Sequence, residues 1–444
     1  MKNLRPFTAL LVFTILVLPV HAEDLADEVA ELRRLLVEIQ QDYDSRIDDL
    51  EMRLARAERQ ARGAERNADE AIELAEQTAI DQTSGAASPN AFNPAIGSVF
   101  VAGFSNVDPG WTAIPGFMPG GELGPGNSGF SLGESDFNLQ ASIDPYFYGN
   151  LTLAIASEDG ETVLELEEVW IQTTSLPSGF MLTGGRFFSE AGYLNKFHRH
   201  ADDFSDRPLP YQAFFGGQYV VDGLQLRWVA PTSLLVELGA ELNWGGGFPA
   251  TANNETSPGA FTLFTNIGGD LGLSNSWQVG LSWLSADVID RESGTPGESF
   301  TGNSDLATID FVWKWAPDGN ATQKSIKVQA EYFHRDEDGT FAGQLYDGSQ
   351  SGWYLQGIWQ FMQRWRAGYR HDVVDSDNGP LFVGTLLEDP GRASKRDSLM
   401  IDWSLSEFSR LRLQYVVDQV LPQSDQQWSM QDIMSLGAHG AHEF

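Results

Sequence analysis

The stretch Ser233–Trp244, SLLVELGAELNW, contains the pattern that decides the fold. One face of an extended strand here would carry apolar side chains, namely Leu234, Val236, Leu238, Ala240, Leu242 and Trp244. The other face would carry Glu237, Glu241 and Asn243, because successive side chains of a strand point to opposite sides. A water-soluble sandwich would bury the apolar face in a core, whereas a membrane barrel would turn it towards lipid.

The same alternation recurs from Ser98 to the end of the chain. It predicts about sixteen strands, beginning near residues 98, 129, 146, 163, 179, 218, 232, 258, 275, 304, 322, 350, 365, 395, 408 and 430. Long connections alternate with short ones; the long ones are 107–128, 189–217, 246–257, 289–303, 337–349 and 375–394. Aromatic residues fall near strand ends, at Trp244, Trp277, Trp315 and Trp365. Such girdles and alternating loop lengths are typical of outer-membrane proteins, so residues 97–444 are predicted to form an all-β, transmembrane antiparallel barrel.

The N-terminus predicts export. Lys2 and Arg5 precede an apolar run that ends at Pro19, and a small-residue exit follows, so residues 1–22 resemble a signal peptide cleaved after Ala22. The run is too short to span a bilayer comfortably. The chain has no cysteine, which excludes disulfides, and its net charge of −34 makes nucleic acid an improbable partner.

Residues 23–80 have a different composition and a different period. Apolar or small residues recur at alternating steps of three and four, which predicts a coiled coil and favours self-association. A homotrimer is one expectation, and a solvated single helix is the alternative. Residues 81–96 are rich in small and polar residues and are predicted to be a linker. An even number of strands would leave both barrel ends in the periplasm, where the coiled coil must lie.

The longest connection, residues 189–217, is the candidate constriction. By its order and length this loop resembles the third external loop of porins, which folds inward. A plain external loop with solvated charges is the alternative reading. The candidate constriction residues are Arg186, His198, Arg199, His200, Asp202, Asp203 and Asp206, with the wall residues Glu165, Glu167, Glu237, Glu241, Arg366, Arg370, Arg396, Arg410 and Arg412. Acidic residues facing arginines across the lumen would create a transverse field that favours small polar or charged solutes.

One spacing in this loop could hold a metal. His198, His200 and Asp202 offer imidazole and carboxylate donors that suit zinc, whereas a charged loop without any metal is the simpler interpretation. The chain contains neither a Gly-x-Ser-x-Gly elbow nor a helical His-Glu-x-x-His motif, so no enzyme is expected. A diffusion channel would need no cofactor.

Two regions carry a family resemblance. They are Gly185–Phe188 with Asn195, His198 and Asp206–Pro208, and the C-terminal Ser435–His442. Both look like a proteobacterial family often labelled zinc-regulated TonB-dependent outer-membrane receptors, and the layout also resembles phosphate-selective and carbohydrate porins. The final Phe444 resembles the signal that the barrel-assembly machinery reads. TonB-dependent receptors resemble one another in a plug domain and a 22-stranded barrel, for which this chain is too short, so the resemblance implies passive channels.

The favoured function is therefore passive diffusion of small hydrophilic or charged solutes across the outer membrane. Uptake of a metal ion such as zinc through a receptor is one alternative. A structural tether, in which the coiled coil joins the envelope layers, is the other.

Overall fold

The computed structural model describes Arg34 and residues 94–107, 113–118, 120, 128–158, 161–251, 257–293, 295 and 297–437. The predicted signal peptide, the coiled coil, most of the linker and Phe444 lie outside these residues. Within the described part of the chain, no helix has both the length and the apolar character needed to cross a membrane.

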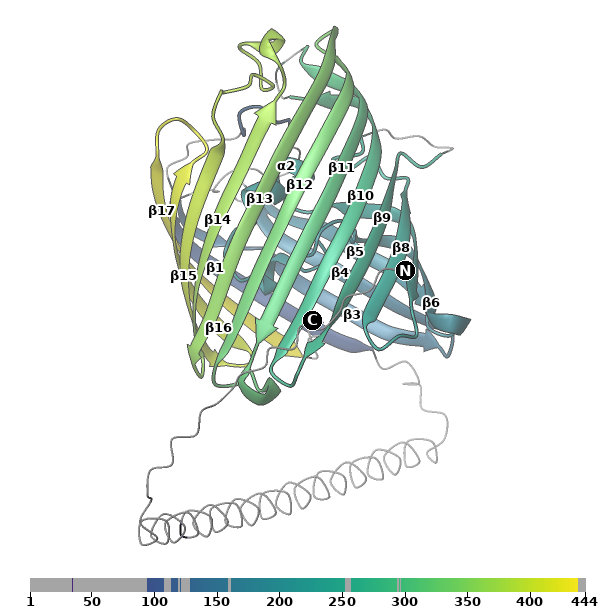
Figure 1. Cartoon of the computed structure of the whole chain (residues 1–444), viewed down its shortest axis with the longest axis vertical. Helices are drawn as coiled ribbons and strands as arrows, with labels where there is room; N and C mark the ends of the chain where they lie inside the picture. The colour runs from purple at the N-terminus through teal and green to yellow at the C-terminus, as the bar shows by residue number, and fades with distance from the viewer. Residues whose placement is uncertain are drawn as a thin grey trace, which may run out of the picture. The chain divides into compact units, whose positions relative to one another are not determined.

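The described residues form one antiparallel sheet that closes on itself into a barrel (Figure 1). Its strands are β1 (Ala95–Asn106), β2 (Gly129–Leu132), β3 (Ser135–Asp144), β4 (Phe147–Glu158), β5 (Glu161–Thr173), β6 (Phe180–Phe188), β7 (Val220–Val229), β8 (Leu235–Asn243), β9 (Ala260–Leu271), β10 (Asn275–Glu292), β11 (Ser299–Trp315), β12 (Ser325–Phe341), β13 (Gln344–Met362), β14 (Trp365–Asp377), β15 (Ser394–Ser406), β16 (Ser409–Gln419) and β17 (Asp425–Gly437). Closure leaves no free sheet edge, which is a requirement for strands in lipid.

The barrel has sixteen positions for its seventeen strands, because β2 and β3 both pair with β1 and share one position. Strand β1 closes the barrel against β17, with Gly97 opposite Gly437. Both ends of the described barrel therefore lie at the side of the short turns, as the even strand number predicts. The predicted strand starts lie close to the observed ones along the chain.

Two predicted long loops are wrong. Residues 337–349 contain a two-residue hairpin, in which Ala342 (φ 50°) and Gly343 (φ 76°) join β12 directly to β13. Both central residues have positive φ, as type I′ hairpin turns require. Residues 289–303 likewise contain the ends of β10 and β11. The apolar alternation fades in both places, because these strands continue past the apolar band and no longer need an apolar outer face.

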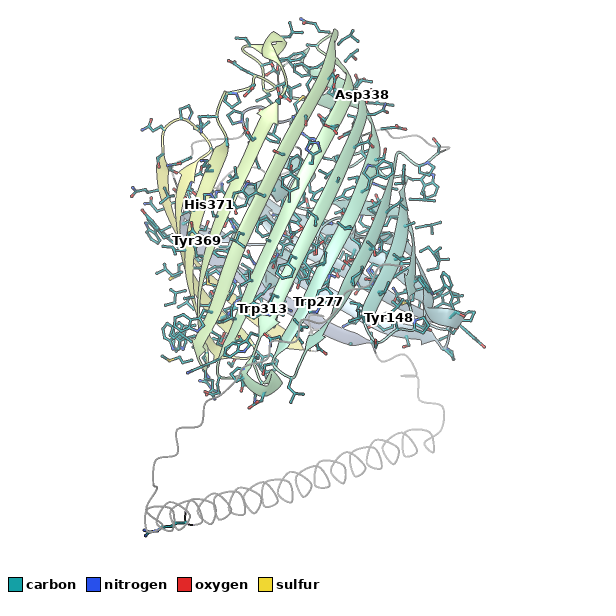
Figure 2. All side chains as sticks on the ribbon, viewed as in Figure 1. Tyr148, Trp277, Trp313, Asp338, Tyr369 and His371 are labelled. Atoms are coloured by element: carbon teal, nitrogen blue, oxygen red, sulfur yellow. The ribbon has the colours of Figure 1, made fainter. Side chains whose placement is uncertain are left out.

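The outer surface of the barrel is apolar over a broad band. Leu281, Ile309, Phe311 and Leu355 are between 41% and 49% exposed and point away from the lumen. Tryptophan Trp365 of β14 stacks on Trp403 of β15 beside the short turns. Figure 2 shows Trp277 and Trp313 near the turn end of the barrel and Asp338 near the opposite end. The band therefore ends in aromatic residues on the turn side and gives way to acidic residues on the other side, which suits a lipid-facing surface.

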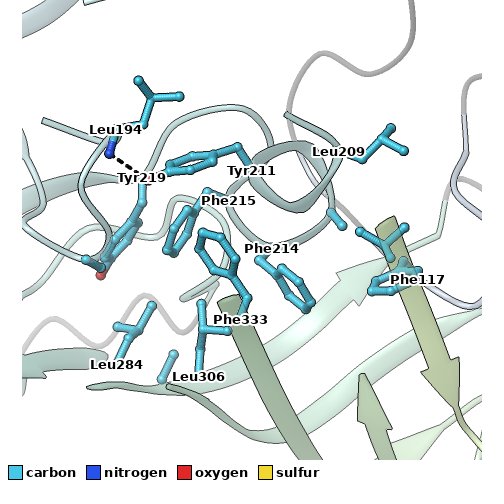
Figure 3. Packing of buried hydrophobic residues seen from close by; sticks show 14 of the residues in the cluster. Phe117, Leu194, Leu209, Tyr211, Phe214, Phe215, Tyr219, Leu284, Leu306 and Phe333 are labelled. Atoms are coloured by element: carbon cyan, nitrogen blue, oxygen red, sulfur yellow. Dashed lines mark hydrogen bonds between the residues drawn. The ribbon is translucent and has the colours of Figure 1, made fainter. Parts of the chain in front are cut away.

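The interior contains an apolar cluster as well as polar residues. The short helix α2 (Leu209–Phe215) belongs to the 189–217 loop and ends at Gly216, which has φ 63°. Phe214 and Phe215 pack on Phe333 of β12, and Tyr211 packs on Phe333 and on Tyr354 of β13 (Figure 3). The longest connection is therefore folded inside the barrel and held to one side of its wall.

Candidate pore constriction

The two ends of the 189–217 loop are joined by one asparagine. The buried Asn195 side chain donates to the carbonyls of Ser189 and Tyr219, each at 2.8 Å, and accepts the Tyr219 N–H at 2.7 Å. Glu241 of β8 accepts the Ser189 hydroxyl at 2.5 Å and the Glu190 N–H at 3.0 Å. These contacts fix where the loop leaves the wall and where it returns.

Replacing Asn195 with alanine should destabilise the folded barrel. Each buried polar group that loses its partner costs about 1–3 kcal/mol, and three hydrogen bonds are removed together. Thermal unfolding in detergent would measure the loss. Asn303→Ala, at an exposed position on β11, is the control and should change stability by less than about 0.5 kcal/mol. Equal melting of the two variants would contradict this role of Asn195.

Glu331 of β12 anchors the middle of the loop. Its buried carboxylate accepts the N–H groups of Tyr193 at 2.9 Å and Leu194 at 3.2 Å. It also accepts the hydroxyls of Tyr211, at 2.9 Å, and Tyr354. Because α2 supplies one of these hydroxyls, the polar anchor and the apolar cluster fasten the same segment.

The next part of the loop is held by basic residues of β12, β14 and β15. Asp203 lies 2.9 Å from the Lys327 ammonium and 3.1 Å from the Arg366 guanidinium. Burial alone would raise the pKa of Asp203, but these cations outweigh burial and hold it well below its usual range. Asp206 lies 2.6 Å from Arg396 and 3.0 Å from Arg370. The loop aspartates therefore bind the arginines of β14 and β15.

The arginine wall is also partly neutralised by carboxylates of its own strands, which reduces its contribution to the expected transverse field. The additional pairs are Arg370–Asp372 at 3.0 Å, Arg396–Asp418 at 2.8 Å and Arg412–Asp402 at 3.0 Å. Arg412 and Arg410 each donate at 2.6 Å to a loop carbonyl, those of Asp202 and His200. The five arginines predicted for this wall are Arg366, Arg370, Arg396, Arg410 and Arg412. Among them, only Arg410 forms no ion pair with a described carboxylate.

A β-bulge builds the acidic side of the lumen. The bulge falls where Thr152 and Leu153 of β4 oppose β5, and it turns the adjacent Glu167 and Glu168 inward together. The two carboxylates clamp His198, with Nδ1 3.1 Å from Glu167 and Nε2 3.1 Å from Glu168. Burial alone would lower the pKa of His198, but these two contacts raise it well above its usual value.

The loop places His200 beside this clamp. Its ring stacks on that of His198, with 5.5 Å between the ring centroids. Its Nδ1 lies 2.6 Å from the carboxylate of Asp136 on β3. Arg199, between the two histidines, lies 3.9 Å from Glu134. The histidine segment therefore faces the acidic wall, while Asp203 and Asp206 face the basic wall.

Several predicted site residues have other positions. Arg186 lies on the outer face, where it pairs with Asp222 at 2.6 Å, because its neighbour Phe187 takes the inward position. Asp202 pairs with Arg207 at 2.7 Å, so it is not part of a histidine cluster. Burial raises the pKa of Asp202 to about 6 despite the opposing effects of Arg207 and Arg412.

The predicted glutamates face the lumen but differ in their roles. Glu237 pairs with Arg227 at 3.1 Å, and Glu241 holds the start of the loop, so both are structural anchors. Glu165 lines an interior cavity. The partly exposed side chains of His334 and His371 pair with Asp336 and Asp397.

Two cavities lie inside the barrel and share His200. One, of about 640 Å³, is bordered by Glu134, Glu165, Arg199 and Asp206. The other, of about 1230 Å³, is bordered by Arg366, Arg410 and the turns that follow β11, β13 and β15. Open space therefore exists on both sides of the histidine segment, away from the wall that carries α2.

Sequence reasoning missed several contributors, among them Asp136, Glu168, Lys327 and Glu331. Adjacent Glu167 and Glu168 in an alternating strand are a signal for a bulge, since one of them would otherwise face lipid. No comparable sequence signal marks Glu331, because its role depends on the hydrogen bonds that it accepts from the 189–217 loop.

Comparisons with known proteins agree with this fold. No family model matches the chain. An uncharacterized protein of Aquifex aeolicus (strain VF5) is 28% identical over 338 residues, covering 71% of this chain and 70% of that protein. A loop L8 deletion mutant of OmpT, an outer membrane protein of Vibrio cholerae, aligns with a TM-score of 0.50 and 10% identity over 78% of this chain and 99% of that one. The fold thus defines a sixteen-stranded transmembrane β-barrel.

Two further solved structures are similar at lower scores. Pseudomonas putida OprB aligns with a TM-score of 0.48 and 13% identity over 78% of this chain and 94% of that chain. An anion-selective porin from Comamonas acidovorans aligns with a TM-score of 0.47 and 10% identity over 77% and 98% of the two chains.

Proposed function

We propose that this protein is an outer-membrane channel through which small hydrophilic or charged solutes diffuse passively. The observation that carries the proposal is the pair of cavities, both lined by His200, inside a closed barrel with an apolar outer band. Outer-membrane lipid would contact this band, and the short turns would face the periplasm. A homotrimer is the proposed assembly.

The path for solutes runs along one side of the lumen. Helix α2 and its aromatic cluster fill the side of β12 and β13, whereas the cavities border β1, β16 and β17. The segment 198–206 would then form the narrowest part. Charged side chains line this passage and exclude bulky apolar solutes, since these would have to strip water from the charges.

The charges favour cations over anions. Most arginines of the basic wall are paired with aspartates, as described above. The acidic wall presents Glu134, Asp136, Glu165, Glu167 and Glu168 against His198, His200 and Arg199. A modest cation preference is therefore proposed, with Arg410 as the main opposing charge.

Conductance of the purified mature protein in a planar bilayer tests the proposal. Stable stepwise currents are expected, and a salt gradient should give a reversal potential of the sign for cation flow. Folding can be verified independently by β-sheet circular dichroism. Silence from correctly folded protein would overturn passive diffusion and favour a gated receptor or a tether.

A further inference from the structure

The histidine clamp has the donor set of a metal site. Asp136, Glu167 and His198 each offer one ligand atom, and these three atoms lie within 4.8 Å of one another. His198 Nδ1 is 3.1 Å from the Glu167 carboxylate and 3.9 Å from the Asp136 carboxylate. The three residues come from the loop, β5 and β3, so the site exists only when the loop is folded inside the barrel.

These separations match those between ligands of one small ion. Zinc binds imidazole nitrogen and carboxylate oxygen at about 2.0–2.2 Å. Atoms at two corners of a tetrahedron with such bonds lie about 3.3–3.5 Å apart. The observed 3.1 Å and 3.9 Å bracket this range. All three atoms lie within 4.8 Å of one another, so an ion could be accommodated by side-chain shifts on the order of 1 Å.

A second, independent feature is the arrangement behind the histidine. His198 Nε2, the nitrogen that faces away from Asp136 and Glu167, lies 3.1 Å from Glu168. Histidine ligands commonly donate their other ring N–H to a carboxylate, which fixes the tautomer and strengthens the ligand. The bulge of β5 supplies both roles from adjacent residues, with Glu167 as a ligand and Glu168 as the orienting group.

We propose that Asp136, Glu167 and His198 bind one divalent transition metal ion, preferentially zinc, at the narrowest part of the lumen. Three protein ligands leave a further coordination position for water or a solute. Binding displaces the Nδ1 proton to water, since a metal-bound nitrogen cannot keep it. His200, whose Nδ1 lies 2.6 Å from Asp136, orients that carboxylate.

Binding of zinc alone to the tag-free, full mature chain in detergent provides the test. Isothermal titration calorimetry should show one zinc per chain, and cobalt(II) should give the visible absorption of a low-coordinate site. His198→Ala and Asp136→Asn should each abolish this binding. Glu168→Gln should weaken it by about 10–100-fold, because that residue orients the histidine.

Two controls separate this site from other donors. Asp338→Asn changes an exposed carboxylate on the outward side of β12 and should leave zinc binding unchanged. His439→Ala with His442→Ala removes the two C-terminal histidines, which lie outside the described residues, and should also have no effect.

Either of two results would contradict the proposed metal site. Absence of a stoichiometric zinc site in folded protein, or undiminished binding by His198→Ala, would overturn the metal proposal and leave His198 as a charged clamp between two glutamates. Retention of the heat-stable barrel in each variant excludes misfolding as the reason for lost binding. The result does not depend on conductance, so the metal site and the channel function can fail separately.

Discussion

Single-channel conductance should rise severalfold when Asp203 and Asp206 are both replaced by alanine. The two carboxylates bind Lys327, Arg366, Arg370 and Arg396 across the lumen. Breaking a buried ion pair by removing one partner costs about 3–5 kcal/mol. Part of the stabilisation would remain, because the arginines stay paired with the wall aspartates Asp372, Asp402 and Asp418. The segment around residue 203 would lose its attachment to the wall, and the passage would widen.

The matched control carries the same change in net charge. Asp336→Ala with Asp338→Ala removes two exposed carboxylates from the outward side of β12 and should leave conductance unchanged. Planar-bilayer recordings at equal salt compare the single-channel conductance of both double variants with that of the parent. If the Asp203 and Asp206 variant conducts like the parent, the segment 198–206 does not limit the current.

Neutralising Arg410 and Glu165 should move ion selectivity in opposite directions. Arg410 borders the larger cavity and Glu165 the smaller one. A unit charge 4 Å from a passing ion contributes about 1 kcal/mol in water, which changes the local ion concentration by about fivefold. Arg410→Gln should therefore increase cation preference, whereas Glu165→Gln should reduce it.

Reversal potentials under a salt gradient measure both changes. The shifts should shrink as salt rises, because the screening length falls to about 3 Å at 1 M. Arg186→Gln is a suitable control, since Arg186 also loses one positive charge but lies on the outer face. A shift by Arg186→Gln as large as that by Arg410→Gln would show that the sign of charge matters and its position in the lumen does not.

Much of the wall could be predicted from the sequence, because lipid imposes a strict alternation. The strand around Leu234–Trp244 has the required apolar face, and Glu237 and Glu241 are buried on the other side as expected. The prediction weakened where that constraint ends. Strands β12 and β13 extend beyond the apolar band, so their outer residues such as Asp338 and Asp347 gave no alternating signal and were assigned to a loop.

The candidate site was harder to predict, because contacts across the lumen depend on which residues meet. The loop and its charged residues could be identified by length and composition. The pairing of Asp202 with Arg207, instead of with the histidines, follows from the local path of the loop and has no signature in residue spacing. Arg186 was misplaced for a related reason, since a one-residue change of phase moves a side chain from lumen to lipid.

The aromatic cluster around α2 limits which movements of the 189–217 loop could open or close the lumen. Swinging the whole loop into solvent would expose Phe214, Phe215, Tyr211 and Leu209, which are at most 1% exposed in the barrel. Exposing a buried side chain of this size costs about 1.5–3 kcal/mol. Four such residues together approach the entire free energy of folding of an ordinary domain. Any physiological opening and closing must therefore come from small shifts of the charged segment 198–206, while helix α2 stays packed against the barrel wall.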